Sequence, residues 1–339
     1  MKTSGCPDLS TAFWGKSAAE PRRYKMIKIH CGIDTSLYTT SAAAVTEEGT
    51  MFSVSRLLAV KEGERGVRQS DALFQHTVDL PGVLNELDSQ IKEAYSGYEI
   101  VSMGVSTRPR TVEGSYMPCF LAGVNAASAL AFGAGVPLLP FSHQEGHIAA
   151  AIHGCPEFPI HAAVFFAFHM SGGTCELLRV EKTKTGFREE IIGKSRDITC
   201  GQLVDRTGVK LGLSFPCGKE LEKLANEYPV GKAPKVSGEK GCINLSGFEN
   251  QIDRMIQNGV DNGKIAAFVY DVILAAVEKI LDESGAKKEN LPILFAGGVM
   301  SSPRLKEHLQ GYFTLPWLAT DNACGIALLA KAGWEREKL

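Results

Sequence analysis

Apolar and polar positions in the first half of the chain predict a sheet accompanied by two helices. Residues 26–34 form an apolar run that ends at Asp34, and a polar turn then leads into a second apolar run. Leu80, Val83 and Leu87 share one face of a predicted helix. The predicted strands are residues 26–34, 35–46, 56–60 and 100–107, and the predicted helices are residues 80–96 and 121–135.

The second half repeats this organisation without a close sequence repeat. Apolar runs there predict three consecutive strands, and a long amphipathic segment then predicts a helix. The predicted strands are residues 161–173, 174–186, 187–197 and 292–300, and the predicted helices are residues 201–213, 263–286, 302–310 and 322–339. The pattern therefore predicts an α/β protein with two similar halves, 26–160 and 161–339.

Residues 1–25 lack this periodicity and mix Pro, Gly, Ser and charged residues, so we expect a disordered extension before Met26. Nine scattered cysteines without a CxxC pair argue against a disulfide framework and favour a cytoplasmic protein. No apolar run reaches the roughly 18 residues of a membrane helix. The net charge of −2 gives no overall positive field for nucleic acid, although a local basic patch stays open.

Glycine-rich junctions follow three predicted strands, at "GIDTS", "HMSGG" and "FAGGV". Such junctions present bare backbone N–H groups, which accept phosphate oxygens, although a glycine often simply ends a strand. Because the junctions occur in two matching halves, the pattern favours a nucleotide held in the cleft between them.

The segment "FSHQEGHIAAAIHG" raises the question of a metal site, a protease motif or a helix that happens to be rich in histidine. On a helix, His143 and His147 lie on one face, with Cβ atoms about 5–6 Å apart, and could share a metal ion. In HExxH proteases the general base follows the first His directly. Here Glu145 comes two residues after His143, so we expect it to point away from the pair.

The order of motifs resembles the TsaD family, whose actin-like (ASKHA) proteins make threonylcarbamoyladenosine in tRNA and were once called glycoproteases. The resemblance covers about residues 27–333 and rests on "GIDTS", "SHQEGH", "SGGTCEL", "GQLVDRTGVKLGL", "FPCGKELEKLA", "FAGGVMSSPRL" and "ATDNA". It implies two RNase-H-like halves with a nucleotide and metal cleft between them.

The resemblance also implies one iron or zinc ion on His143, His147 and Asp321. Spacing alone would make Asp321 the N-cap of the last helix. His169 occupies the position where archaeal and eukaryotic members have a tyrosine. It could be a fourth ligand or a histidine hydrogen-bonded at a strand end.

An adenylate or adenine nucleotide is the implied ligand of the cleft. Asp205, with Gly218 and Glu222, matches the ribose contact, although without the motif the two acids would be an ordinary solvated helix face. The matching phosphate turn is Ser171, Gly172 and Gly173; the matching adenosine turn is Gly297 and Gly298, followed by Ser302.

The implied reaction transfers a threonylcarbamoyl group from threonylcarbamoyl-adenylate to N6 of the adenosine beside the anticodon. The residues do not identify a catalytic acid or base. The family's partners are tRNA, a homologous TsaB-like subunit and a TsaE-like ATPase, and a dimer stays open.

Several positions depart from the family pattern. Tyr38 and Thr39 replace an acidic pair, and Ser302 replaces an asparagine. The loop "STRPRTVEGSYMP" brings Arg108 and Arg110, which could contact phosphate or simply face water. These changes leave open a divergent paralogue that transfers carbamoyl to another acceptor, a non-catalytic partner subunit, or a sugar-kinase-like ATPase.

Overall fold

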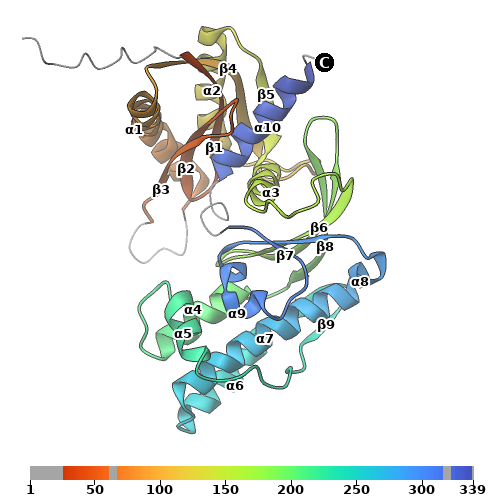
Figure 1. The fold of residues 1–339 in the computed structure, drawn as a ribbon. Helices are drawn as coiled ribbons and strands as arrows, with labels where there is room; N and C mark the ends of the chain where they lie inside the picture. The colour runs from red at the N-terminus through yellow and green to blue at the C-terminus, as the bar shows by residue number, and fades with distance from the viewer. Residues whose placement is uncertain (1–25, 61–66, 316–321, 338–339) are drawn as a thin grey trace, which may run out of the picture.

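The computed structural model describes residues 26–60, 67–315 and 322–337, which form two sheets with helices around them (Figure 1). The extension expected at residues 1–25 lies outside the described residues. No helix in the described part of the chain combines the length and apolar character needed to cross a bilayer.

The first sheet has five strands in the order β3-β2-β1-β4-β5. They are β1 (Met26–Thr35), β2 (Thr39–Thr46), β3 (Met51–Leu57), β4 (Gly97–Arg108) and β5 (Leu138–Ser142). β1 to β3 form an antiparallel meander, whereas β1, β4 and β5 run parallel. The parallel strands therefore bring Asp34 of β1 to the same end of the sheet as Ser142 of β5.

Helices cover both faces of the first sheet. α1 (Gln69–Ala94) packs on β2 and β3, and α2 (Phe120–Ala134) packs on β1 and β4. α10 (Asn322–Glu337) crosses back to pack on β1, β2 and β4 (Figure 1). A Cβ atom at Gly32 would lie 2.4 Å from the carbonyl oxygen of Ala323, so glycine permits this close approach.

The second sheet has seven strands in the order β12-β11-β6-β7-β8-β10-β9. They are β6 (Val164–Met170), β7 (Cys175–Lys182), β8 (Phe187–Ser195), β9 (Ser237–Glu239), β10 (Cys242–Asn244), β11 (Ile293–Ala296) and β12 (Tyr312–Phe313). Phe166 and Phe168 of β6 are fully buried and belong to the largest apolar core, together with one face of the long helix α7.

The helices of this half lie mainly on one side of the second sheet (Figure 1). They are α4 (Cys200–Lys210), α5 (Gly218–Ala225), α6 (Ser246–Gln257), α7 (Asn262–Glu283), α8 (Ala286–Glu289), the 3₁₀ turn η1 (Gly298–Ser301) and α9 (Pro303–Lys306). Between the two sheets lies α3 (His143–His153), which contacts β4, β5, β8, β11 and α10.

Several predicted elements differ from the observed ones, and β5, α5 and α6 were not predicted. The third strand is Met51–Leu57 rather than 56–60, because it pairs with β2 from Met51 onward. α1 begins at Gln69 rather than 80, because burial of Ala72 and His76 extends the packed face. The helix expected at 302–310 is helical only at Pro303–Lys306. The expected boundary at 160/161 separates the sheets, but α10 returns to the first one.

Candidate functional site

The start of α3 is fixed by a capping box. The backbone N–H of Glu145 donates to the hydroxyl oxygen of Ser142 at 3.1 Å, and the Ser142 N–H donates to the Glu145 carboxylate at 2.7 Å. The other Glu145 oxygen accepts from the backbone N–H of Phe187 at 3.1 Å. The carboxylate of Glu145 is therefore directed at backbone amides and not at the histidine pair.

His143 and His147 face each other from successive turns of α3. Their Nε2 atoms lie 3.1 Å apart. On its other side, Nδ1 of His143 lies 3.0 and 3.1 Å from the two carboxylate oxygens of Asp34, at the end of β1. The side-chain nitrogen of Asn322, at the start of α10, lies 2.6 Å from the same Nδ1 atom.

Asp34 is the buried acid of this group, with 1% exposure. Burial alone would raise its pKa, but the charge of His143 and hydrogen bonds from His143, Ser106 and Asn322 lower the pKa below the usual value. Nδ1 of His143 lies against this carboxylate, and Nε2 is the ring atom directed at His147. A carboxylate behind a histidine is the arrangement that orients metal-binding imidazoles.

His169 of β6 completes a group of three histidines, with its ring centroid 5.0 Å from that of His147. Burial and neighbouring positive charge lower the pKa of His147 well below its usual value and that of His169 to about 4. Both rings are therefore held neutral at pH 7, the form that binds metal ions.

The histidine group fits a metal ion in donor chemistry, because two Nε2 atoms converge and a carboxylate lies against Nδ1 of one ring. Within the described ranges, however, no three His, Cys, Asp or Glu side chains have the arrangement of a complete metal site. The predicted third ligand, Asp321, lies outside the described residues.

Two of the predicted glycine turns meet beside His169. β11 runs parallel to β6, with Ala296 opposite His169, so the turn at Gly297 lies against the end of β6. Gly297 has a φ of 95°, and a Cβ atom there would lie 2.2 Å from the carbonyl oxygen of Met170. In the other turn, the Ser171 hydroxyl accepts from the N–H groups of Gly173 and Thr174 at 3.3 and 3.1 Å.

The predicted ribose residues make contacts within the second half. Asp205 accepts the backbone N–H of Cys217 at 2.9 Å, just before Gly218 begins α5. Glu222 accepts from the Ser302 hydroxyl at 2.5 Å and from the backbone N–H of Arg304 at 3.0 Å. The fold thus brings Glu222 and Ser302 together. Both hydrogen bonds are accepted by the same carboxylate oxygen of Glu222, Oε1.

An open cleft of about 840 Å³ lies between the halves and brings part of the predicted nucleotide set together. Gly172 and Asp205 line it from the second half, and Tyr38 and Val60 line it from the first. The volume lies within the range of small-molecule sites.

The loop after β4 connects the two halves. Arg110 donates to both carboxylate oxygens of Glu176 on β7, at 2.9 and 2.8 Å. Thr111 donates through its hydroxyl and backbone N–H to Glu189 on β8. Arg108 is the final residue of β4, opposite Ser142.

Sequence reasoning missed four side chains of this region: Asp34, Asn322, Glu176 and Glu189. Asp34 carried a signal, because it is an acidic residue that ends an apolar run. Glu176 and Asn322 lie inside the quoted motifs "SGGTCEL" and "ATDNA", but their partners are 66 and 179 residues away in the sequence and only the fold reveals them. Glu189 carried no signal.

Comparisons with known proteins agree with this geometry. A family model described as "TsaD: tRNA N6-adenosine threonylcarbamoyltransferase" matches residues 65–328. A Streptococcus suis (strain 05ZYH33) protein named tRNA N6-adenosine threonylcarbamoyltransferase is 28% identical, over 91% of this chain and 93% of its own. One of the same name from Streptococcus pneumoniae (strain ATCC 700669 / Spain 23F-1) is 26% identical, over 90% and 92%.

Among solved structures, T. kodakarensis HypF aligns with a TM-score of 0.52 at 12% identity, over 93% of this chain and 48% of that chain. Full-length HypF in its phosphate- and nucleotide-bound form gives 0.50 at 12% identity, over 93% and 56%. These likenesses concern the fold, and the predicted actin-like α/β class is confirmed. With the match of its sequence over residues 65–328, the chain belongs to the TsaD family.

Proposed function

We propose that this protein transfers a threonylcarbamoyl group from threonylcarbamoyl-adenylate to N6 of the adenosine beside the anticodon in tRNA. The observation that carries the proposal is the convergence of Asp34, His143 and His147, beside the turns at Ser171 and Gly297, in a TsaD-family chain. The enzyme class is that of an acyltransferase acting on tRNA.

His143 and His147 would hold one iron or zinc ion together with Asp321. His169, whose ring centroid lies 5.0 Å from that of His147, would be the fourth ligand. Such an ion, when bound, supplies a Lewis acid for the carbamoyl carbonyl. Asp34 keeps the proton on Nδ1 of His143 and thereby directs Nε2 of that ring toward His147.

The remaining chemistry rests on binding and orientation. The turn at Ser171, Gly172 and Gly173 would receive the adenylate phosphate, and the turn at Gly297 and Gly298 would bind the adenosine. Asp205 would accept from the ribose hydroxyls. The N6 amine attacks the carbamoyl carbon, loses a proton, and the bond to the phosphate oxygen breaks to release AMP. Backbone N–H groups that the fold holds in position would favour this step, because they stabilise the negative charge that develops on the leaving phosphate.

Proteolysis is disfavoured by the same geometry. A metalloprotease needs a general base within reach of the attacking water. The two oxygens of Glu145 accept from the backbone N–H groups of Ser142 and Phe187 instead.

A partner subunit and a cytoplasmic location complete the proposal. Phe74 and Val78 lie one turn apart on α1 and are 69% and 60% exposed, and Phe132 on the neighbouring α2 is 91% exposed. Such an exposed apolar face indicates an interface. A TsaB-like homologous subunit would cover it, and a TsaE-like ATPase would join the assembly.

One observation favours a second candidate, transfer of carbamoyl to another acceptor from a different adenylate. Tyr38 lines the cleft where the family pattern has an acidic residue, and it is 46% exposed. An altered cleft wall changes which adenylate fits.

Complementation of a TsaD-depleted bacterium, with mass spectrometry of tRNA nucleosides, tests the proposal. The unaltered chain should restore threonylcarbamoyladenosine, and His143→Ala should not, while Glu190→Gln on an exposed position of β8 serves as the matched control. A chain that is expressed, binds adenine nucleotide and restores no modified nucleoside would favour the second candidate. Restoration by His143→Ala would refute the role of the histidine pair.

A further inference from the structure

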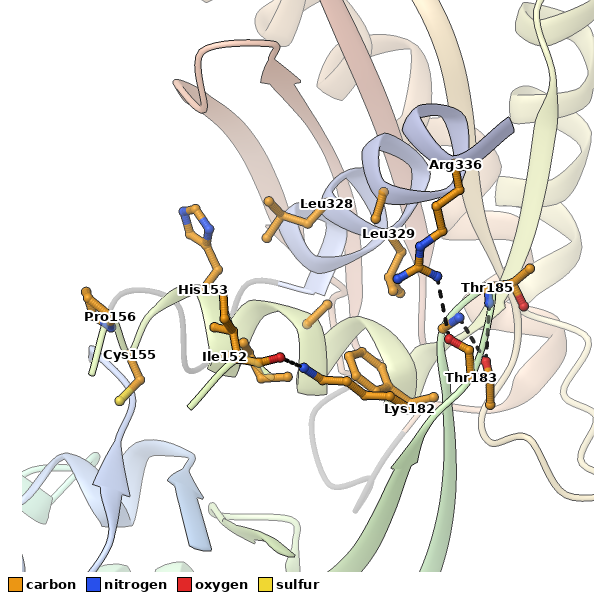
Figure 2. Close-up of a pocket in the computed structure, with 15 residues that line it drawn as sticks. Ile152, His153, Cys155, Pro156, Lys182, Thr183, Thr185, Leu328, Leu329 and Arg336 are labelled. Carbon is orange, nitrogen blue, oxygen red and sulfur yellow. Dashed lines mark hydrogen bonds between the residues drawn. The ribbon is translucent and has the colours of Figure 1, made fainter. Parts of the chain in front are cut away.

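A second cavity, of about 370 Å³, lies behind α3 at the junction of the two halves (Figure 2). Its walls come from α3, from α10, from the segment 155–160 and from the hairpin that joins β7 to β8. α10 packs on the first sheet and the hairpin belongs to the second, so the cavity is built by both halves.

This cavity is separate from the histidine site. His143 and His147 face Asp34 and His169, whereas Ala149 and Ile152 line the cavity from the other side of α3. At about 100° per residue, Ile152 points away from the two histidines.

Much of the cavity wall is apolar, with Ile152, Phe187, Leu328 and Leu329 among its side chains. Small side chains such as Ala149 and Ala332 leave the space open. The volume lies near the lower end of the range for small-molecule sites, about 300–1,000 Å³. The wall therefore fits a compact apolar body.

Two cations lie at the edge of this apolar wall. Lys182 donates to the backbone carbonyl of Ile160, and Arg336 donates to that of Thr183 at 3.5 Å (Figure 2). Arg336 also donates to the carbonyl of Lys184. Within the described residues, no ion pair places a carboxylate within 4.0 Å of either cation. Burial, and then the charge of Arg336, lower the pKa of Lys182, so an anion between the two would relieve their repulsion.

We propose that this cavity binds a small amphiphilic anion. Its acidic head group, a carboxylate or a phosphate, lies between Lys182 and Arg336, and its short apolar body lies against Ile152, Phe187 and Leu329. Such a ligand matches two features of the described residues: two cations that have no carboxylate partner among them, and an apolar wall beside a cavity of this volume. The proposal does not depend on the transferase reaction.

Calorimetry with three eight-carbon probes, namely octanoate, octyl phosphate and octanol, tests the site on the full chain. We expect at least one of the two anions to bind at one per chain, and octanol to bind at least tenfold more weakly. The anion that binds with the higher affinity identifies the preferred head group. Absence of binding by both anions, or equal binding of octanol, would overturn the proposal.

Substitutions in the cavity wall then test whether the probe binds in this cavity. Lys182→Ala/Arg336→Ala should weaken anion binding at least tenfold, whereas Lys184→Ala, on the same hairpin but outside the cavity wall, should leave it unchanged. Ala332→Phe keeps both cations and fills the cavity, so it should also abolish binding. Adenine nucleotide binding and the melting temperature verify that each variant is folded. Unchanged anion affinity in the folded double variant, or in Ala332→Phe, would refute the site.

Discussion

At the scale of single residues, the environment of Asp34 explains how one histidine of the pair is oriented. The carboxylate is buried, its pKa is lowered, and its two oxygens lie 3.0 and 3.1 Å from Nδ1 of His143. The contact joins residues 109 positions apart, so helix spacing could predict the histidine pair but not the acid behind it.

Asp34→Asn should lower the affinity for iron or zinc by about 10- to 100-fold, because the neutral amide holds the Nδ1 proton less strongly. Metal content after dialysis against graded chelator concentrations measures the effect. Asp88→Asn, in the C-terminal part of α1 and half-buried beside Tyr98, is the control and should retain full metal affinity. Equal metal retention by Asp34→Asn and the unaltered chain would contradict the role of Asp34.

Arg110 was predicted to be a candidate phosphate contact, and its guanidinium donates to both Glu176 oxygens. The pair is partly buried, with 33% and 16% side-chain exposure. The arginine therefore has a structural partner, and phosphate contact stays a prediction for Arg108 and Arg110 alike.

Arg110→Ala should reduce the free energy of unfolding by about 1–2 kcal/mol, because it leaves a partly buried carboxylate without its partner. Urea unfolding measures this effect. Among the described residues the Arg108 side chain makes no hydrogen bond or ion pair, so Arg108→Ala should change the free energy of unfolding by less than about 0.5 kcal/mol. If Arg110→Ala leaves stability unchanged but weakens nucleotide binding in the presence of EDTA, the arginine serves phosphate rather than Glu176.

At the scale of elements, Asp197 fastens the start of α6 to the end of β8. Its carboxylate accepts from the backbone N–H groups of Ile198, Leu245 and Ser246 and from the Ser246 hydroxyl. Burial alone would raise its pKa, but these hydrogen bonds lower it to about 2.

Asp197→Ala should destabilise the chain by about 1–2 kcal/mol, because several backbone donors lose a charged acceptor at a largely exposed site. The folded pKa is depressed, so this contribution is present above the usual pKa of 3.8 and is lost as the pH falls toward about 2. Urea unfolding at pH 7 and at pH 3 measures both effects, with Glu190→Ala on β8 as the control. If the loss of stability caused by Asp197→Ala is the same at pH 7 and at pH 3, the stabilising role of the ionised Asp197 carboxylate is contradicted.

Element prediction succeeded for some periodic segments and missed others, since α5 and α6 are amphipathic helices that were not predicted. The face of Leu80, Val83 and Leu87 predicted the middle of α1, and the structure buries all three residues. The first turns of α1 were missed, because they carry polar residues that only packing against the sheet makes helical. Short strands such as β9, β10 and β12 were missed as well, since two or three residues contain no readable period.

At the scale of the whole molecule, the sequence predicted two α/β halves, and the two sheets match them. The family was assigned mainly from the order of the motifs along the chain. Turns between a strand and a glycine keep their spacing while the surrounding residues change. What it could not predict is which half the last helix joins, since an apolar helix face fits either sheet.

The exposed apolar face of α1 and α2 leads to a prediction about assembly. Phe74→Asp/Phe132→Asp should abolish binding to the TsaB-like subunit of the same organism, because two charges would be buried in the interface. Light scattering of the mixed proteins measures this, and Val112→Asp, at an exposed position in the loop after β4, is the control. A double variant that still forms the complex would place the interface elsewhere.

The return of α10 to the first sheet has a consequence for synthesis on the ribosome. The nascent chain emerges with β1 to β5 made early, yet the helix that fills the groove at Gly32 and Gly104 is translated only after the second sheet. The second half can therefore complete its core before the first half does, the reverse of the usual N-terminal-first order. Until translation ends, one face of the first sheet is open to chaperones and to wrong partners.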